Sequence, residues 1–312
     1  MNQDHWQEVT LIGLGNQGLA WAQNLKESSL IVHCYLRENS PKQEQAKDLN
    51  LNLISCVEQA KGPLLLLIPD HQIFSFIKEN SIPKGSPLIY AHGASLIEND
   101  LQELFPEYSH CLLAPKAIAS ELREEYKRGG KLGAVYSVEY PSPNEESEEL
   151  RRKILKLAQD LGITAGPYEV TFKQETTADL LSEQSLLCGL IPYAAKACYD
   201  RLRQAGIPQE LAYLEAWHEV KLIGNAMSQK GPAGLFDLIS PHALAGAHKA
   251  SQMLFDKEYQ ETIEKLLTDI ENGQFFKEAH TFFTEDENQS VEDFWGRSEI
   301  NQTYLGIKDS LT

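Results

Sequence analysis

One stretch near the amino terminus decides the fold of this chain: it reads VTLIGLGNQG and spans residues 9–18. Its first four residues form a short apolar run typical of a buried strand, and residues 19–25 have the composition of a helix. The G-x-G-x-x-G loop between them is the fingerprint of dinucleotide binding, in which glycines let the backbone approach a pyrophosphate at a helix amino terminus. We therefore expect a nucleotide to be bound by Gly13, Leu14, Gly15, Asn16, Gln17 and Gly18.

The loop after the second predicted strand, residues 30–36, distinguishes NADP from NAD. An acidic residue at the end of that strand holds the ribose 2′-hydroxyl of NAD, whereas cations accommodate the 2′-phosphate of NADP. Arg37, Ser40 and Lys42 follow the strand here and offer two cations and a hydroxyl to a phosphate. Glu38 keeps NAD open as an alternative, because its carboxylate could accept a ribose hydroxyl in another loop conformation. The sequence favours NADPH.

Apolar runs alternate with helical stretches in the first half of the chain, which predicts a doubly wound parallel sheet of the Rossmann type. Ligands of such sheets bind at the carboxyl ends of the strands. Asp70, His92 and Lys116 follow three of these ends, and we assign Asp70 to the cofactor. A histidine in such a place is as often structural as catalytic. The predicted strands are residues 9–12, 30–36, 64–68, 87–90, 110–113 and 133–138.

Strand signals stop near residue 170, and helical periodicity dominates the rest of the chain. We therefore expect two domains, a nucleotide-binding domain at residues 1–170 and an all-helical domain at residues 171–312. The stretch from about residue 283 is polar and acidic, with Trp295 and Tyr304 as candidate anchors. The predicted helices of the second domain are residues 176–204, 208–229, 240–255 and 257–272.

Two acidic pairs, Asp179 with Glu183 and Glu215 with Glu219, have the i, i+4 spacing that places each pair on one face of a helix. Both pairs share their helical stripe with leucines, so the carboxylates occupy positions where the hydrophobic period predicts core residues. Buried carboxylates are costly unless they are paired, protonated or bound to a metal, and divalent cations would relieve their repulsion. For either pair taken alone, a solvated acidic face is the simpler interpretation.

Composition limits the possible partners. The chain has 312 residues, enough for two cores, and its net charge of −17 argues against nucleic acid or an anionic membrane as the main partner. No apolar stretch approaches the length of a membrane span, and the amino terminus lacks the features of a secretory signal. Five cysteines without C-x-x-C spacing predict reduced, mostly buried thiols in a cytoplasmic protein.

Taken together, the motifs resemble ketol-acid reductoisomerase, the acetohydroxyacid isomeroreductase of branched-chain amino acid synthesis. The resemblance covers residues 9–275 and is most specific at TADLLSEQ, residues 177–184, and AYLEAWHEVKLI, residues 212–223. It is supported by AHG at residues 91–93 and APK at residues 114–116. It implies NADPH and two Mg²⁺ as cofactors and a small ketol acid as substrate. By this resemblance the metal ligands are Asp179, Glu183, Glu215 and Glu219, the catalytic residues include His92, Lys116 and Glu183, and Ser240 contacts substrate.

The length and the single helical domain resemble the short form of that family. In that form the helical domain is knotted and two chains interlock, so that each active site takes acidic ligands from both. The resemblance therefore implies a homodimer or a higher homo-oligomer.

The chemistry expected of such a protein follows from its substrate. A 2-hydroxy-3-keto acid such as acetolactate presents neighbouring oxygens that suit hard cations, and two bound ions would acidify the hydroxyl and polarise the carbonyl. An alkyl group then migrates, and the new 2-keto group accepts hydride to give a 2,3-dihydroxy acid. We expect Asp179 to bridge the ions, Lys116 to stabilise alkoxide charge or relay a proton, and His92 to act as a base or to orient water.

Two loops depart from the family pattern, and they keep other functions open. The family has Gly-Pro-Gly-His after the catalytic lysine, whereas this chain has AIAS at residues 117–120. The family continues with Thr-Ala-Glu after the substrate serine, whereas this chain has PHALAG at residues 241–246. The alternatives are a divergent NADP-dependent reductase of another 2-keto acid or an imine, and a non-catalytic NADP-binding paralogue.

Overall fold

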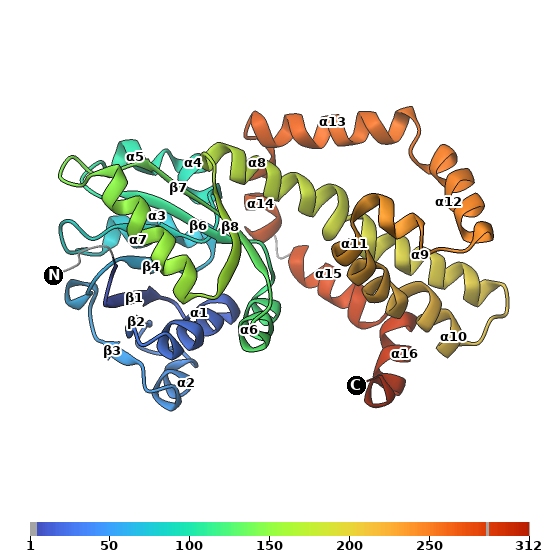
Figure 1. The fold of residues 1–312 in the computed structure, drawn as a ribbon, viewed down its shortest axis with the longest axis horizontal. Coiled ribbons are helices and arrows are strands. Elements are labelled where there is room, and N and C mark those ends of the chain that lie inside the picture. Colours follow the sequence, from blue (N-terminus) through green and yellow to red (C-terminus); the bar gives the residue numbers. More distant parts are fainter. Residues whose placement is uncertain (1–4, 285–286, 312) are drawn as a thin grey trace. The chain divides into compact units, whose positions relative to one another are not determined.

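The computed structural model describes residues 5–284 and 287–311, and it divides into two compact units (Figure 1). Unit 1 is Met1–Thr176 and unit 2 is Thr177–Thr312. Among the described residues, no helix combines the length and the apolar character that crossing a membrane requires.

Unit 1 is built on an eight-stranded sheet with the strand order β3-β2-β1-β4-β5-β6-β7-β8. Every neighbouring pair is parallel except β6 with β7, which is antiparallel. The predicted α/β fold class is therefore confirmed. The strands are β1 (Glu8–Ile12), β2 (Ile31–Tyr35), β3 (Asn52–Ile54), β4 (Leu64–Leu66), β5 (Leu88–Tyr90), β6 (His110–Pro115), β7 (Leu132–Tyr140) and β8 (Ile163–Glu169).

All six strands predicted from the sequence form, and the structure adds β3 and β8. β3 has three residues, too few for a hydrophobic period to be recognised. β8 contains Gly166 and Pro167, residues that argue against a strand interior but are tolerated at a sheet edge, where β8 lies. Both additions are edge strands, so neither changes the order of the strands that carry the nucleotide loop.

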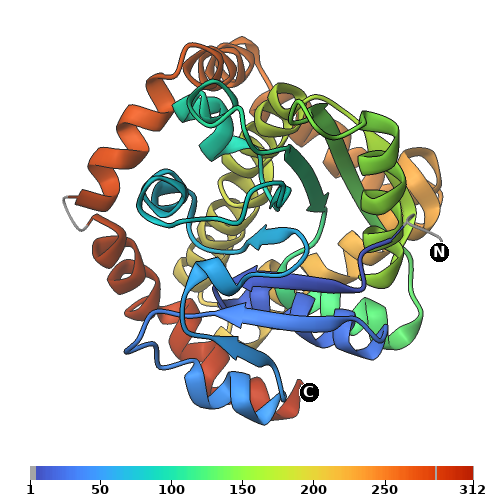
Figure 2. The ribbon, with the colours of Figure 1, turned by 90° about the vertical axis from the view of Figure 1, so that its left-hand side faces the viewer.

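Helices cover both faces of the sheet because successive strand residues point to opposite sides (Figure 1 and Figure 2). Val9 and Leu11 of β1 belong to one apolar core with Trp21, whereas Ile12 belongs to a second core with Tyr90. This double burial explains the continuous apolar runs. The helices are α1 (Asn16–Glu27), α2 (Gln43–Asp48), η1 (Val57–Gln59), α3 (Asp70–Glu79), α4 (Ala94–Asn99), α5 (Leu101–Leu104), α6 (Ala119–Arg128), α7 (Ser147–Asp160) and α8 (Phe172–Ser182), which continues into unit 2.

Unit 2 is all-helical in its described residues. Its carboxy-terminal part packs through the two aromatic residues proposed as anchors: Trp295 contacts Trp217, and Tyr304 stacks on Tyr213. The elements are η2 (Glu183–Leu187), α9 (Leu190–Gln204), α10 (Gln209–Tyr213), η3 (Leu214–His218), α11 (Glu219–Phe236), α12 (Pro241–Leu254), α13 (Lys257–Glu271), α14 (Gln274–Thr284), α15 (Glu287–Gly296), α16 (Glu299–Ile307) and η4 (Lys308–Ser310).

Two turns of π-helix, η2 and η3, interrupt what the sequence predicted as two continuous α-helices. In η2 the amide of Cys188 donates to the carbonyl of Glu183 over 2.9 Å, which is the i+5 to i bond of a π-turn. Gly189 closes this turn so tightly that a Cβ there would lie 1.9 Å from the Gln184 carbonyl oxygen. Such turns are rare and are often found at functional sites. Each of them carries one member of an acidic pair, Glu183 in η2 and Glu215 in η3.

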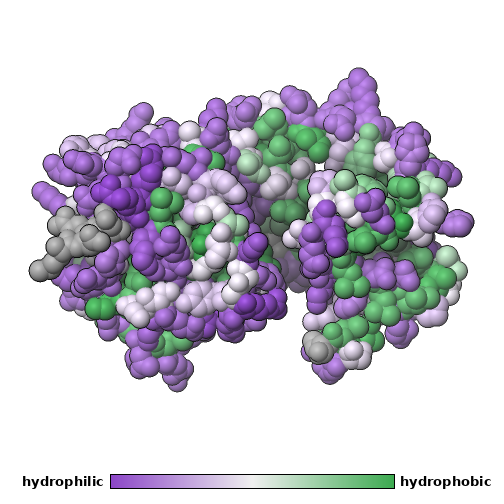
Figure 3. Space-filling model, in the orientation of Figure 1, coloured by the Kyte–Doolittle hydropathy of each residue, from purple (hydrophilic) through white to green (hydrophobic). Residues whose placement is uncertain are grey.

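Unit 2 buries little apolar surface by itself. Among its described residues the core cluster has five buried members, and α11 and α12 bury none. Leu222, beside the second acidic pair, is 53% exposed, and Figure 3 shows apolar side chains spread over the surface of these helices. The stripes expected to lie in a core are therefore exposed in the single chain, together with Glu183, Glu215 and Glu219.

The five cysteines are all free thiols. Cys34 and Cys111 are buried, and burial raises the pKa of Cys34 to about 12. Cys188 and Cys198 are exposed on unit 2, so the expectation of mostly buried thiols holds for unit 1 only.

Candidate active site

The glycine loop has the geometry that a dinucleotide requires. Gly13 has a φ of +94°, and a Cβ there would lie 2.8 Å from the carbonyl oxygen of Leu67, so a side chain does not fit. Gly18 packs as closely, because its Cβ would lie 2.7 Å from the Gly13 carbonyl oxygen. Gly15 is the N-cap of α1 and offers no side chain to the first amides of that helix. The first turn of α1 therefore presents backbone N–H groups that suit a pyrophosphate.

The loop predicted to select the cofactor lies beside the glycine loop. The amide of Gly13 donates to the carbonyl of Tyr35 over 3.2 Å, which joins the ends of β1 and β2. Beyond β2 the Ser40 amide donates to the Arg37 carbonyl over 2.9 Å, and the Ser40 hydroxyl accepts from the Lys42 amide over 3.3 Å. The turn thus carries all three predicted residues, with the Arg37 side chain exposed.

Four polar side chains gather at the carboxyl ends of β4, β5 and β6. His92 Nδ1 lies 3.6 Å from Asp70 Oδ2, and His92 Nε2 lies 3.9 Å from Glu175 Oε2. Lys116 Nζ donates to Glu175 Oε1 over 2.7 Å. The sequence predicted Asp70, His92 and Lys116 at these strand ends, and the structure brings all three together around Glu175.

Glu175 is the member of this group that the sequence analysis missed. Its side chain is fully buried, and it also accepts from the Gly93 amide over 2.9 Å. A Cβ on Gly93 would lie 2.5 Å from Thr176 Oγ1, so glycine is required for this approach. The signal was present: Glu175 precedes Asp179 by four residues on α8, which extends the acidic stripe by one turn.

The four predicted metal ligands all lie in unit 2. Asp179 is half-buried on α8, Glu183 begins η2, Glu215 lies within η3, and Glu219 begins α11. Over residues 5–284 and 287–311, no cluster of three potential ligands that includes Glu183, Glu215 or Glu219 forms within the single chain. The described part of the single chain therefore does not assemble these carboxylates into one cluster.

The remaining predicted features are Ser240 and the two loops that depart from the family pattern, residues 117–120 and 241–246. Ser240 is the N-cap of α12, and its hydroxyl accepts from the Ala243 amide over 3.2 Å. Ile118 follows Lys116 by two residues and is 72% exposed. His242 is exposed in the first turn of α12.

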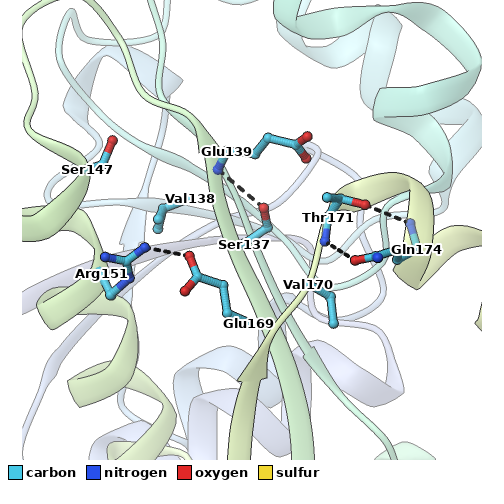
Figure 4. A pocket seen from close by; sticks show the side chains of 9 residues that line it. All are labelled: Ser137, Val138, Glu139, Ser147, Arg151, Glu169, Val170, Thr171 and Gln174. Carbon is cyan, nitrogen blue, oxygen red and sulfur yellow. Dashed lines mark hydrogen bonds and ion pairs between the residues drawn. The ribbon is translucent and has the colours of Figure 1, made fainter.

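A separate surface pocket of unit 1 contains none of the predicted site residues (Figure 4). Two of its charged groups pair, since Arg151 Nη2 donates to Glu169 Oε1 over 2.6 Å, and Glu139 accepts from the Phe172 amide over 3.1 Å. The strand ends, rather than this pocket, therefore carry the candidate site. The pocket is lined by Ser137, Val138, Glu139, Ser147, Arg151, Glu169, Val170, Thr171 and Gln174.

Comparison with known proteins agrees with this geometry. The family described as "Acetohydroxy acid isomeroreductase, NADPH-binding domain" matches residues 5–166, and "Ketol-acid reductoisomerase, C-terminal domain" matches residues 172–305. An NADH-preferring ketol-acid reductoisomerase from an uncultured archean is similar in structure, with a TM-score of 0.86 and 26% identity. That match covers 97% of this chain and 94% of the archaeal one.

Two further solved structures share the fold alone. A 1-pyrroline-5-carboxylate reductase from Streptococcus pyogenes has a TM-score of 0.57 and 14% identity over 85% of this chain and 98% of its own. A variant imine reductase from Myxococcus stipitatus has a TM-score of 0.51 and 14% identity over 86% of this chain and 93% of its own. The two family matches, by contrast, together span most of the sequence. The chain therefore belongs to the ketol-acid reductoisomerase family and is an oxidoreductase with a nicotinamide-dinucleotide-binding domain.

Proposed function

We propose that the protein is a Mg²⁺-dependent, NADPH-linked isomeroreductase that converts an acetolactate-like 2-hydroxy-3-keto acid to a 2,3-dihydroxy acid. The observation that carries this proposal is the pair of π-turns, one at each acidic pair of a chain from this family. A metal-independent reductase has no use for four carboxylates held in this way. Their oxygen donors suit Mg²⁺, which prefers carboxylates and retains water ligands.

The residues that would hold the ions are Asp179, Glu183, Glu215 and Glu219. When bound, the ions would acidify the substrate hydroxyl and polarise its carbonyl. Asp179 would hold metal together with Glu183, and Glu183, at the first position of η2, is proposed to contact substrate as well. Ser240 is proposed to donate a hydrogen bond to the substrate carboxylate. Its hydroxyl oxygen accepts from the Ala243 amide at the start of α12, which leaves the O–H free to donate.

The polar group of unit 1 would handle charge and protons. In 2-acetolactate the C2 hydroxyl loses its proton, the C2 methyl migrates to C3, and the C3 oxygen gains a proton. Hydride from NADPH then adds to C2, and the C2 oxygen takes a second proton. Glu175 holds the ammonium of Lys116 in place to stabilise alkoxide charge and to return a proton. His92, between Asp70 and Glu175, is the proposed base or water-orienting residue.

Arg37→Ala is expected to raise the KM for NADPH by roughly 10-fold or more, because a charge-assisted hydrogen bond contributes about 1.5–3 kcal/mol. The KM for NADH should change little, since NADH lacks the 2′-phosphate. Steady-state kinetics with both cofactors checks this. The matched control is Arg128→Ala, because Arg128 is the last residue of α6 and belongs to no predicted site. The archaeal relative is NADH-preferring, and Glu38 is the residue that would favour NADH here. An equal effect of Arg37→Ala on both cofactors would contradict the NADPH assignment.

We propose a homodimer or a higher homo-oligomer, because α11 and α12 expose apolar side chains that a second copy would cover. Such a copy could also supply the carboxylates that one chain leaves apart. Light scattering during size-exclusion chromatography should give at least twice the chain mass of 35.1 kDa. Met253→Glu, which places a charge on this apolar surface where Met253 is exposed, should lower that mass, whereas Ile31→Glu in unit 1 should not. A wild-type monomer would refute the proposal.

The assay that tests the function compares two substrates. NADPH oxidation is followed with 2-acetolactate and with a 3-hydroxy-2-oxo acid, first with Mg²⁺ and then with EDTA. Mg²⁺-dependent turnover of both supports the full reaction. Reduction of the 2-oxo acid alone would identify a reductase that has lost migration, the alternative that the departing residues 117–120 keep open. NADPH binding without any turnover would favour a non-catalytic paralogue.

A further inference from the structure

We infer that the carboxy-terminal helices α15 and α16 brace the π-turn η3, and that Trp295 and Tyr304 are positioning residues for Glu215 and Glu219. The inference rests on the proposed function, in which these two carboxylates hold metal. It assigns a task to the polar, acidic end of the chain, which the reaction does not otherwise use.

The segment from the end of α10 through η3 to the start of α11 has an inner and an outer face. Ala212, Tyr213 and Ala216 are buried, whereas Glu215 and Glu219 are exposed. The inner face belongs to the small core of unit 2, together with Ile300 of α16 and Tyr199 of α9. The position of the two carboxylates is therefore set by what packs on the opposite side of the turn.

Aromatic residues from the last helices make that contact. The rings of Trp217 and Trp295 lie 5.8 Å apart, and Trp295 also meets Tyr193 of α9 edge-on at 5.2 Å. The rings of Tyr213 and Tyr304 stack at 6.1 Å with an angle of 27° between their planes. Aromatic pairs at such distances stabilise a contact beyond the apolar area that they bury. A ring from a carboxy-terminal helix thus contacts the chain just before Glu215, at Tyr213, and another contacts it between Glu215 and Glu219, at Trp217.

The brace is itself anchored to α9. Tyr199 Oη and Thr303 Oγ1, both buried, share a hydrogen bond of 2.8 Å. Arg203 Nε donates to Glu299 Oε1 over 2.8 Å at the start of α16. Because α9 begins three residues after η2 ends, the same helix connects the brace to the turn that carries Glu183.

A π-turn needs such support because its geometry is less favourable than that of the surrounding α-helix. Without the brace, the segment would relax toward a regular α-helical register, which would rotate Glu215 and Glu219 relative to each other. The predicted consequence is weaker metal binding with unchanged nucleotide binding, since the glycine loop belongs to unit 1.

The test uses Mn²⁺ as a paramagnetic probe, with its affinity for the full-length protein measured by electron paramagnetic resonance without substrate. Trp295→Ala and Tyr304→Ala should each raise the Kd for Mn²⁺ by about 10-fold, as supporting residues of metal sites do. The Kd for NADPH, measured by fluorescence, should stay within about 2-fold of wild type. Turnover should recover partly at high Mg²⁺. Trp295→Phe should retain most of the Mn²⁺ affinity, and Tyr168→Ala, an exposed tyrosine of unit 1, is the control.

The outcomes separate the inference from the proposed function. Mn²⁺ binding that is lost in Glu215→Gln but unchanged in both brace variants would overturn the brace and leave the metal site intact. Wild-type protein that binds no Mn²⁺, or whose binding survives Glu215→Gln, would overturn the proposed function itself. Parallel losses of Mn²⁺ affinity, NADPH affinity and oligomer mass would show that the aromatic residues serve the general fold, which also overturns the inference.

Discussion

Glu215→Gln should lower kcat with 2-acetolactate by about 100-fold or more, because a bound metal supplies several kcal/mol of charge stabilisation in the transition state and each 1.36 kcal/mol changes the rate 10-fold. Glutamine keeps the size of the side chain and removes its negative charge. Glu215 is exposed, so the substitution should leave the free energy of unfolding almost unchanged. The measurement is steady-state turnover over a range of Mg²⁺ concentrations.

The matched control is Glu210→Gln, an exposed carboxylate on α10 one residue outside the segment between Leu211 and Glu219. It removes the same charge from the same region of unit 2 and should leave turnover within about 2-fold of wild type. If Glu215→Gln retained full Mg²⁺-dependent activity, Glu215 would not be a metal ligand.

Lys116→Met is expected to affect both activity and stability. Turnover should fall by about 10²–10³-fold, the usual effect of removing a group that stabilises developing negative charge. The Glu175 carboxylate, fully buried, would lose its cation. Removing one partner of a buried pair costs about 3–5 kcal/mol, and we expect no more than about 3 kcal/mol here because 38% of the Lys116 side chain is exposed. Urea denaturation at fixed protein concentration measures this loss.

Adding Glu175→Gln to Lys116→Met separates the two effects. The amide removes the uncompensated charge but can still accept the hydrogen bond from the Gly93 amide, so the double variant should regain most of the lost stability. Activity should not return, because the ammonium is still missing. A double variant less stable than Lys116→Met would show that Glu175 does not depend on Lys116 for its charge balance.

The nucleotide end of the site could be predicted because its signals are local. The strand, the glycine loop and the helix over residues 8–27 are adjacent in sequence, and the close backbone contacts at Gly13 and Gly18 require glycine. The carboxyl-end rule then placed Asp70, His92 and Lys116 on one edge of the sheet without knowledge of the strand order. These predictions needed no long-range contact to be known in advance.

The metal end could be predicted only in part. The acidic pairs are visible as i, i+4 spacings, but a π-turn leaves no mark on the hydrophobic period, so η2 and η3 were not foreseen. Glu175 was missed because it contacts residues far away in the chain, Gly93 and Lys116. The apolar stripe beside Glu219 was assigned to a core, whereas it is exposed in the single chain. A hydrophobic pattern shows that a face is covered, and it does not show which molecule covers it.

The central claim is that the protein moves an alkyl group and reduces the product, and nuclear magnetic resonance of the product from 2-acetolactate, NADPH and Mg²⁺ tests it most directly. Migration before reduction gives 2,3-dihydroxy-3-methylbutanoate, whose two methyl groups on C3 are both singlets. Reduction without migration gives 2,3-dihydroxy-2-methylbutanoate, with one methyl doublet. We predict the two singlets, and their loss when EDTA removes Mg²⁺. A methyl doublet, or a product that forms equally well in EDTA, would contradict the proposed isomeroreductase.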